Sequence, residues 1–397
     1  MPNYKYLIVG GGMTADAAVN GIRDVDPHGS IGLISAEPNP PYNRPPLSKG
    51  LWKGDAPDGI WRGTERQGAT LHLGRQARSL DPAQKSVIDD QGSVYTYEKL
   101  LLATGATPRH LPFHDASIIY YRTLEDYRRL RTLTERGRRF AVIGGGFIGW
   151  EVAAALAMNG KEVVMIFPEE AIGERIYPVE LARFLNDYYR QKGVNVVSGA
   201  AIVGLEKTSQ GVQVRTSARG EFVVDGVVAG IGVAPNVELA QSAGLQVSDG
   251  IVVDELLRTS HPGVYAAGDV ANFSSAALGR RLRVEHEDNA NTMGREAGRS
   301  MAGEARPYLH LPFFYSDLFD LGYEAVGELD PRLETVADWK EPHREGVVYY
   351  LRDGRVRGVL LWNVWGQVDA ARQLIAASGP FRAADLIGRL PEAQPGN

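Results

Sequence analysis

The sequence predicts an α/β protein in which two similar strand, turn, helix and strand units precede an α+β domain with an antiparallel sheet. Two glycine-rich turns, which begin at Gly10 and Gly144, each lie between an apolar run and a helical pattern. The end of the chain instead carries short strands and a hairpin signal. A length of 397 residues is enough for two or three domains.

The central unit is the clearest of these patterns. An apolar run from Phe140 to Ile143 leads into the turn Gly144 to Gly149, an Ala-rich helical stretch and a second apolar run from Val163 to Phe167. Glycines in such a turn allow the tight bend, the approach of a pyrophosphate and close helix packing, while the helix N-terminus offers N–H groups to the phosphates. A glycine-rich turn of another α/β protein is the alternative, but strand and helix both stand where a Rossmann-like dinucleotide site requires them.

Two carboxylates follow the second strand of this unit. Glu169 and Glu170 stand where an acidic side chain accepts hydrogen bonds from a ribose 2′-OH and repels a 2′-phosphate. The sequence therefore favours NADH over NADPH at this site.

The N-terminus repeats the same arrangement. The strand pattern Tyr4 to Val9 precedes a GxGxxA turn from Gly10 to Ala15, and a second strand, Ile31 to Ser35, is followed by Glu37 in the ribose-binding position. Two such turns in one chain predict two nucleotide cofactors in separate domains.

Composition excludes several classes of chemistry. The chain contains no cysteine, so thiol redox pairs, cysteine nucleophiles, thiolate zinc sites and cysteine-ligated iron–sulfur clusters are excluded, and redox chemistry must belong to a bound cofactor. The formal charge of −5 argues against general nucleic-acid binding. Neither a long apolar run nor a leader-like N-terminus is evident, so we expect no membrane span and a cytoplasmic location. We also expect no metal site.

Three loops carry further candidates. Arg44 and Lys49 lie in the proline-rich segment PYNRPPLSK, where solvated surface charges are the alternative. Small residues around Thr104 and Gly105 at a strand end allow a ligand to approach the backbone. Asp269 follows the apolar run 263–267 and suits a ribityl or ribose hydroxyl, with a helix N-cap as the alternative.

The C-terminal region predicts an antiparallel sheet. Strand patterns cover Tyr323 to Val326, Val347 to Leu351 and Val356 to Trp362, with Asp353-Gly354 as a hairpin turn. A helix is expected over 369–377, and the tail after Leu390 is expected to fray.

The motifs GxGxxA, PYNRPPLSK, LLATGATPR, GGGFIGWE, GIGVAPN and GVYAAGD in this order resemble the flavoprotein family of NADH:ferredoxin reductases, which includes putidaredoxin reductases and apoptosis-inducing factor. The segments FIGWE, FPEE, RRLRVEH, YSDL and VLLWN most resemble apoptosis-inducing factor and its bacterial relatives. The resemblance implies a glutathione-reductase-like fold with an FAD-binding domain over 1–110 and 237–305, an NADH-binding domain over 111–236 and a C-terminal domain over 306–397.

The resemblance also implies site residues. The residues expected to hold FAD are Gly10, Gly12, Ala15, Glu37, Arg44, Lys49, Ala77, Thr104, Gly105, Arg122 and Asp269. Those expected near the flavin and the incoming nicotinamide are Glu285, His286, Glu287 and Tyr315, and those expected to hold NADH are Gly144, Gly146, Phe147, Ile148, Gly149, Glu169, Gly232, Glu324 and Asn363.

Four of these residues are expected to serve hydride transfer. Phe147 stands at the turn, where its ring could cover the nicotinamide, and Glu151 is expected in the first helical turn, where the helix dipole favours a carboxylate. The family pattern implies an ion pair between Lys49 and Glu151 beside flavin N5, with His286 nearby. A structural role is the alternative for His286.

Two functions fit this resemblance. The first is an FAD-dependent NADH oxidoreductase that passes electrons to a ferredoxin, a quinone or another one-electron acceptor. The second is an NADH-sensing flavoprotein like apoptosis-inducing factor, whose slow turnover leaves a stable reduced-flavin–NAD complex that controls homodimer formation or partner binding. A nucleotide-binding scaffold without redox chemistry is the third alternative. Tyr315 departs from the family, which often has Trp there.

Overall fold

The computed structural model describes residues 1–113, 117–218 and 220–390. They form two compact units. The first unit contains Met1–Arg44, Pro57–Thr107 and Ala234–Pro312. The second contains Pro45–Ala56, Pro108–Val233 and Phe313–Asn397.

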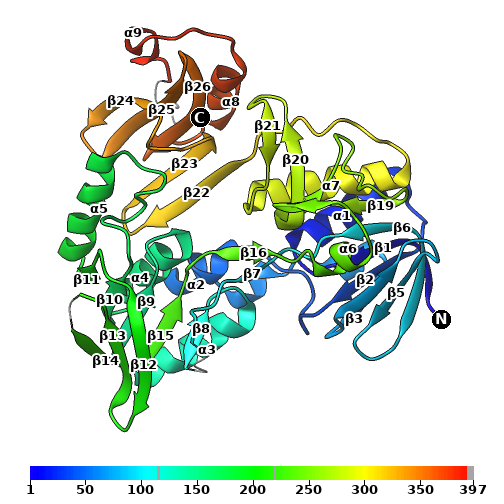
Figure 1. The fold of residues 1–397 in the computed structure, drawn as a ribbon, viewed down its shortest axis with the longest axis horizontal. Helices are drawn as coiled ribbons and strands as arrows, with labels where there is room; N and C mark the ends of the chain where they lie inside the picture. Colours follow the sequence, from blue (N-terminus) through cyan, green and yellow to red (C-terminus); the bar gives the residue numbers. More distant parts are fainter. Residues whose placement is uncertain (114–116, 219, 391–397) are drawn as a thin grey trace. The chain divides into compact units, whose positions relative to one another are not determined.

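The first unit is built on a mixed sheet with the strand order β3-β2-β1-β6-β5-β4, in which β19 also pairs with β6 (Figure 1). The pairs among β1, β2, β3, β6 and β19 are parallel, whereas β4, β5 and β6 pair antiparallel. These strands are β1 (Asn3–Val9), β2 (Ile31–Ser35), β3 (Ala69–Leu73), β4 (Ala77–Asp81), β5 (Ser86–Asp89), β6 (Val94–Leu102) and β19 (Val264–Ala266).

Helices α1 (Met13–Val25) and α7 (Glu287–Ala302) pack closely within this unit. A Cβ atom at Gly21 would lie 2.0 Å from the carbonyl oxygen of Arg295, and one at Gly298 would lie 2.2 Å from that of Ala18. Only glycine fits at these contacts, so the backbone of α1 approaches that of α7 directly.

The remaining elements of the first unit are short. A second sheet has the order β17-β18-β20-β21, and β7 pairs with β16 at two of the places where the chain passes from one unit to the other. The elements are η2 (Pro57–Ile60), η3 (Thr64–Gln67), β7 (Ala106–Pro108), β16 (Val233–Pro235), α6 (Glu238–Ser242), β17 (Val247–Ser248), β18 (Gly250–Val252), η4 (Gly268–Val270), β20 (Ala271–Ser275) and β21 (Arg280–Leu282).

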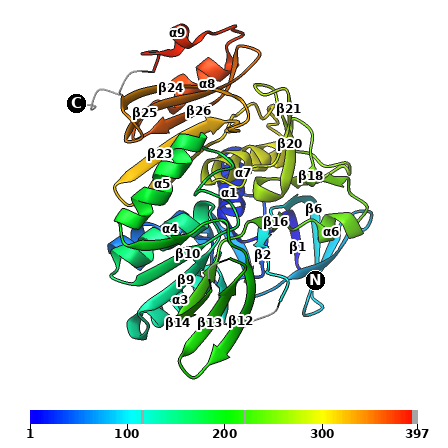
Figure 2. The ribbon, with the colours of Figure 1, turned by 60° about the vertical axis from the view of Figure 1, so that its left-hand side comes forward.

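The second unit contains a parallel sheet with the order β11-β10-β9-β15-β8, and Figure 2 shows the helix-flanked sheet beside the antiparallel strands β12, β13 and β14. Its elements are η1 (Pro45–Leu47), α2 (Gly50–Lys53), β8 (Ile118–Tyr120), α3 (Leu124–Arg136), β9 (Arg139–Ile143), α4 (Phe147–Met158), β10 (Glu162–Ile166), α5 (Val179–Gln191), β11 (Val194–Val197), β12 (Ile202–Thr208), β13 (Gly211–Thr216), β14 (Glu221–Val224) and β15 (Gly226–Ala229).

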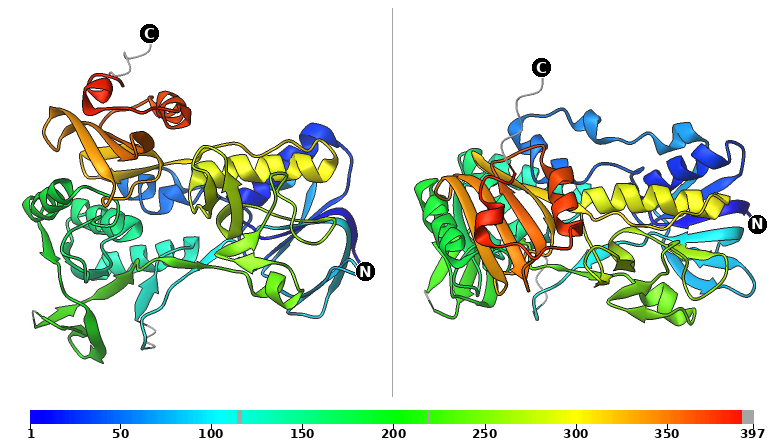
Figure 3. Two further views of the ribbon diagram at one scale, coloured as in Figure 1. Left: turned by 45° about the horizontal axis from the view of Figure 1, so that its top comes forward. Right: turned by 90° about the horizontal axis from the view of Figure 1, so that it is seen from above.

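An antiparallel sheet with the order β22-β23-β26-β25-β24 completes the second unit (Figure 3). The predicted hairpin turn is present, because Asp353 and Gly354 have φ angles of 53° and 70°. The elements are β22 (Phe313–Leu318), β23 (Leu321–Gly327), β24 (Glu334–Glu341), β25 (Glu345–Arg352), β26 (Arg355–Trp362), α8 (Val368–Ala376) and α9 (Ala383–Leu386).

Most predicted elements are observed within a residue or two of their expected bounds. In the C-terminal sheet, strands β22 and β24 were not predicted. The three-domain division at 110, 236 and 305 stays a prediction, and the expected fraying after Leu390 falls outside the described residues.

Candidate nucleotide and hydride-transfer site

The first glycine turn joins β1 to α1 and has the geometry that the sequence predicted. Gly10 has a φ of +134°, and a Cβ there would lie 2.0 Å from the carbonyl oxygen of Ala103. Gly12 is the N-cap residue of α1, which lacks a side-chain cap, and the nearest atom to a Cβ there is Arg44 Nη2 at 4.0 Å. Ala15 is buried in the core. The uncapped helix start therefore has room for a phosphate group.

Arg44 and two predicted carboxylates form one charged group. The Arg44 guanidinium pairs with Glu37, whose other oxygen accepts from Tyr42 Oη at 2.7 Å. Burial alone would lower the pKa of Arg44, but Tyr42, Glu37 and Asp269 raise it above its usual value. Glu37 is thus engaged by Arg44 and Tyr42, while its predicted ribose contact remains a prediction.

Asp269 is not the helix N-cap that we considered as the alternative. It lies inside η4, whose N-cap is Ala267 and which lacks a side-chain cap. Gly268 before it has a φ of +77°, and a Cβ there would lie 2.2 Å from Thr14 Oγ1. The Gly-Asp pair therefore reaches the start of α1, next to the first glycine turn.

Asn236 joins the two loops that carry LLATGATPR and GIGVAPN, and we did not select it as a site residue. Its Nδ2 donates to the carbonyl oxygen of Thr104 at 2.8 Å, and its Oδ1 accepts from Thr107 Oγ1 at 2.7 Å. Thr104 Oγ1 donates to the Asn236 carbonyl oxygen, and the Asn236 N–H donates to the Gly105 carbonyl oxygen. The motif GIGVAPN, which ends at Asn236, is the sequence signal that could have identified this residue.

Other residues expected near FAD occupy varied positions. Ala77 begins β4, and His286 is the N-cap residue of α7 but makes no side-chain cap bond. Glu285 pairs with Arg283, and Glu287 lies in the first turn of α7. Arg122 belongs to the second unit and lies just before α3. Its backbone N–H donates to Asp126 in the first turn of that helix.

The second glycine turn joins β9 to α4. Gly144 has a φ of +115°, and a Cβ there would lie 2.3 Å from the carbonyl oxygen of Gly230. A Cβ at Gly149 would lie 2.0 Å from the carbonyl oxygen of Gly144. Gly146 is the N-cap residue of α4, which lacks a side-chain cap, and no atom lies within 4 Å of a Cβ position there. This turn therefore fits a pyrophosphate as the first one does.

The side chains around this turn contact other residues of the protein. The Phe147 ring contacts Trp150 and Phe314, with centroids 4.9 and 5.6 Å away, and Ile148 packs against Gly230. Glu169 pairs with the exposed Arg175 at 2.6 Å. Their predicted contacts with NADH remain predictions.

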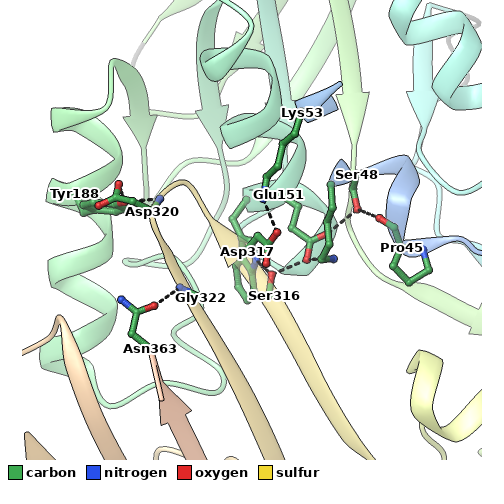
Figure 4. Close-up of polar contacts among 12 residues, drawn as sticks. Pro45, Ser48, Lys53, Glu151, Tyr188, Ser316, Asp317, Asp320, Gly322 and Asn363 are labelled. Atoms are coloured by element: carbon green, nitrogen blue, oxygen red, sulfur yellow. Dashed lines mark hydrogen bonds and ion pairs between the residues drawn. The ribbon is translucent and has the colours of Figure 1, made fainter. Parts of the chain in front are cut away.

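The remaining NADH candidates lie in turns and in the C-terminal sheet. Gly232 has a φ of +91° and accepts from the Arg109 N–H. Burial raises the pKa of Glu324, although the Gly366 N–H donates to this carboxyl and opposes the shift. Asn363 has a φ of 50°, and its Oδ1 accepts from the Gly322 N–H (Figure 4). Its Nδ2 donates to the carbonyl oxygen of Arg344.

Glu151 is the centre of a buried hydrogen-bonded group in the second unit (Figure 4). Lys49 Nζ and Ser316 Oγ donate to Oε1 at 2.6 and 2.5 Å, and Ser48 Oγ donates to Oε2 at 2.6 Å. Glu151 is only 4% exposed, and an unpaired charge there would be costly. The predicted ion pair between Lys49 and Glu151 is therefore present in the structure, with two hydroxyl donors that we did not predict.

Our expectation that Glu151 lies in the first turn of its helix was wrong. Helix α4 begins at Phe147, so Glu151 is its fifth residue, and no acidic residue occupies the first turn. Because the helix dipole acts mainly within the first turn, the direct donors carry more of the stabilisation of this carboxylate.

Tyr315 also contacts the lysine. Lys49 Nζ is 5.2 Å from the centroid of the Tyr315 ring, a cation–π distance. The position that we noted as a departure from the family therefore touches the same lysine that pairs with Glu151.

Two glycine turns with room for a phosphate and a buried lysine–carboxylate pair fit a dinucleotide-dependent oxidoreductase without thiol chemistry. The sequence profile described as pyridine nucleotide-disulphide oxidoreductase matches residues 4–294, and the C-terminal profile of apoptosis-inducing factor matches 297–345 and 338–377. The chain belongs to the pyridine nucleotide-disulphide oxidoreductase family. As predicted, it is an oxidoreductase that uses FAD and a pyridine nucleotide.

Individual relatives match along nearly the whole chain. The anthranilate 1,2-dioxygenase system ferredoxin–NAD(+) reductase component of Burkholderia cepacia is 35% identical over 96% of this chain and 97% of its own length. The mitochondrial apoptosis-inducing factor 1 of Dictyostelium discoideum is 34% identical over 94% of this chain and 78% of its own. Both the predicted resemblance and the relation to apoptosis-inducing factor are confirmed.

The fold class is also confirmed by a solved structure. A chain of the covalent putidaredoxin reductase–putidaredoxin complex superposes with a TM-score of 0.88 at 31% identity, over 95% of this chain and 94% of that chain. Among the described residues, no helix combines the length and apolar character that a membrane span requires.

Proposed function

We propose that this protein is an FAD-dependent NADH:ferredoxin oxidoreductase. The observation that carries the proposal is the pairing of Lys49 with Glu151 in a chain that also contains two glycine turns with room for a phosphate. The relative from Burkholderia cepacia, named as a ferredoxin–NAD(+) reductase component, aligns over almost its full length and supports ferredoxin as the acceptor.

Each unit would supply one set of nucleotide contacts. In the first unit, the turn at Gly10 and Gly12, the carboxylates of Glu37 and Asp269 and the guanidinium of Arg44 would hold FAD. In the second unit, the turn at 144–149 would hold the pyrophosphate of NADH. When bound, FAD would supply the chemistry that takes up a hydride from NADH and releases the electrons singly.

The lysine–carboxylate pair would provide electrostatic support for the reaction. We infer that Lys49 presents its ammonium group to negative charge that develops on the cofactor, and that Glu151 fixes the direction of the lysine side chain. Phe147 would shield the nicotinamide from water, and the role of His286 in hydride transfer stays a prediction. None of these roles needs a covalent bond to the protein.

We infer that the nucleotide is NADH and not NADPH. Glu169 follows β10, and its negative charge would repel a 2′-phosphate while its oxygens would accept from a 2′-OH. Arg175 already pairs with Glu169, so this carboxylate would exchange or share that partner when the nucleotide binds.

Steady-state reduction of a cognate ferredoxin by NADH tests the acceptor. We expect ferredoxin to be reduced at least tenfold faster than oxygen under the same conditions. Equal turnover with oxygen and with every carrier tried, quinones included, would reject the reductase function.

A second function is supported by the C-terminal match to apoptosis-inducing factor. In this alternative, NADH binding changes homodimer formation or affinity for a partner, and turnover is slow. Sedimentation during an NADH titration distinguishes the two functions, because the sensing protein changes mass while the reductase does not need to. A cytoplasmic location is part of our proposal for either function.

A further inference from the structure

Ser316 makes two hydrogen bonds whose directions are fixed by chemistry. It lies on β22 and is fully buried, with an exposed fraction of 0%. Its Oγ lies 2.8 Å from Trp150 Nε1 and 2.5 Å from Glu151 Oε1. Since an indole N–H can only donate and a carboxylate can only accept, Trp150 donates to Ser316 and Ser316 donates to Glu151.

The two serines hold opposite oxygens of the same carboxylate. Ser316 donates to Oε1 and Ser48 donates to Oε2, while Lys49 Nζ also donates to Oε1. The terminal torsion of a glutamate side chain is broad, so a carboxylate without such partners could rotate freely. Hydroxyl donors on both oxygens leave it one orientation, in which Oε1 faces Lys49.

The residues that flank Ser316 contact the segment that carries Lys49. Tyr315 lies beneath Lys49 Nζ, and Asp317 pairs with Lys53 at 2.7 Å. Strand β22 thus contacts the segment 49–53 on both sides of Ser316. Figure 4 shows the pair of Asp317 with Lys53. Ser316 donates to Glu151 Oε1, so its hydroxyl links β22 to the carboxylate itself.

We propose that Ser316 is a positioning residue for hydride transfer, which orients the Glu151 carboxylate so that Lys49 is held at the cofactor. The inference rests on the proposed function, because Lys49 acts there on negative charge at the cofactor. Ser316 does not need to touch the cofactor. Its contribution is to keep the lysine–carboxylate pair in a single geometry. Small displacements of such groups slow the catalysed reaction strongly.

The test compares Ser316→Ala with the wild-type full-length protein loaded with FAD. Rapid mixing with saturating NADH is expected to show flavin reduction slowed about tenfold, with the KM for NADH changed less than about twofold. A potential titration is expected to show a lower midpoint potential. A tenfold loss in stabilisation of the reduced cofactor corresponds to about 30 mV for a two-electron couple.

A double-mutant cycle asks whether Ser316 acts through Glu151. In a Glu151→Ala background, Ser316→Ala is expected to slow flavin reduction less than about twofold further, because the acceptor of its hydrogen bond is already absent. Ser300→Ala is the matched control. Ser300 is also buried and donates to the Leu256 carbonyl oxygen at 2.9 Å, but it lies on α7 in the first unit.

The outcomes separate this inference from the proposed function. If NADH does not reduce the wild-type flavin, the proposed function fails whatever the serine variants do. If NADH reduces the wild type but Ser316→Ala has the wild-type rate and potential, the positioning role is overturned. If Ser316→Ala does not retain FAD, Ser316→Cys decides, since it keeps the size with a weaker donor. A lower rate and potential in Ser316→Cys support the role, and wild-type values reject it.

Discussion

Lys49 Nζ lies 2.6 Å from Glu151 Oε1, although 102 positions separate the two residues in the chain. The lysine precedes the short helix α2, and the glutamate lies in α4 directly after the second glycine turn. Both side chains are largely buried, with exposed fractions of 14% and 4%. The fold therefore brings a charged pair to the helix that begins at the predicted NADH site.

Glu151→Gln removes the charge of the pair and keeps its shape. Lys49 would remain buried without a counter-charge, and breaking such a pair costs about 3 kcal/mol of folding free energy. We expect flavin reduction by NADH to slow more than tenfold while the protein still retains FAD. Stopped-flow spectroscopy and denaturant unfolding measure the two effects. The control is Glu162→Gln, which breaks an exposed pair with Arg138. Wild-type reduction kinetics in Glu151→Gln would make this carboxylate a structural residue.

The two open glycines distinguish the two nucleotide sites. Gly12→Ala and Gly146→Ala each place a methyl group where the protein leaves space of about 4 Å or more. We expect both variants to fold with nearly unchanged Tm, because neither methyl group meets protein atoms. Gly12→Ala should weaken FAD retention, and Gly146→Ala should raise the KM for NADH about tenfold, since each methyl group would meet a pyrophosphate. Gly59→Ala is the control, and equal behaviour of all three would argue against both sites.

Glu169 provides a test of nucleotide preference. Glu169→Ala removes the carboxylate that is expected to repel a 2′-phosphate, so kcat/KM for NADPH should rise relative to that for NADH by about tenfold. Glu180→Gln, an exposed carboxylate at the start of α5, should leave the ratio unchanged. An unaltered ratio in Glu169→Ala would remove Glu169 from the nucleotide site.

We expect Asp225 to make a pH-dependent contribution to the folding stability. Burial alone would raise its pKa, but the N–H groups of Arg139 and Arg138 and the Arg139 guanidinium lower it below the usual value. A carboxyl with a lowered folded-state pKa stabilises the fold above its unfolded pKa of about 3.9, and this contribution is lost as the pH falls through the folded value.

Asp225→Asn should therefore lower the Tm at pH 7, and the difference from wild type should shrink below about pH 4. Thermal unfolding followed by circular dichroism across this range measures the effect. A Tm difference that stays constant into acid would show that the charge of Asp225 is not its cause.

The glycine turns could be predicted because their requirements are local. Gly10 and Gly144 need positive φ angles and close backbone contacts that no other residue allows, so the motif itself carries the structure. The pair of Lys49 with Glu151 could not follow from spacing alone. It required the resemblance to a known family, because the contact joins distant segments.

The sequence contains no comparable signal for the two serines that donate to Glu151. Ser48 and Ser316 lie 103 and 165 positions from Glu151, and serine follows no periodic pattern that would place it beside a carboxylate. Strand β24 was missed because its residues are largely exposed on both faces, so hydrophobic alternation is weak there. The shift of Glu151 out of the first helical turn reflects a helix that begins only at Phe147.

Rapid mixing of the two half-reactions tests the central claim most directly. The FAD-loaded protein is mixed first with NADH and then, after anaerobic reduction, with either oxidised ferredoxin or oxygen. We predict that NADH reduces the flavin within the time of a catalytic turnover and that ferredoxin reoxidises it at least tenfold faster than oxygen. Rapid reduction followed by reoxidation that is equally slow with both acceptors would contradict the account.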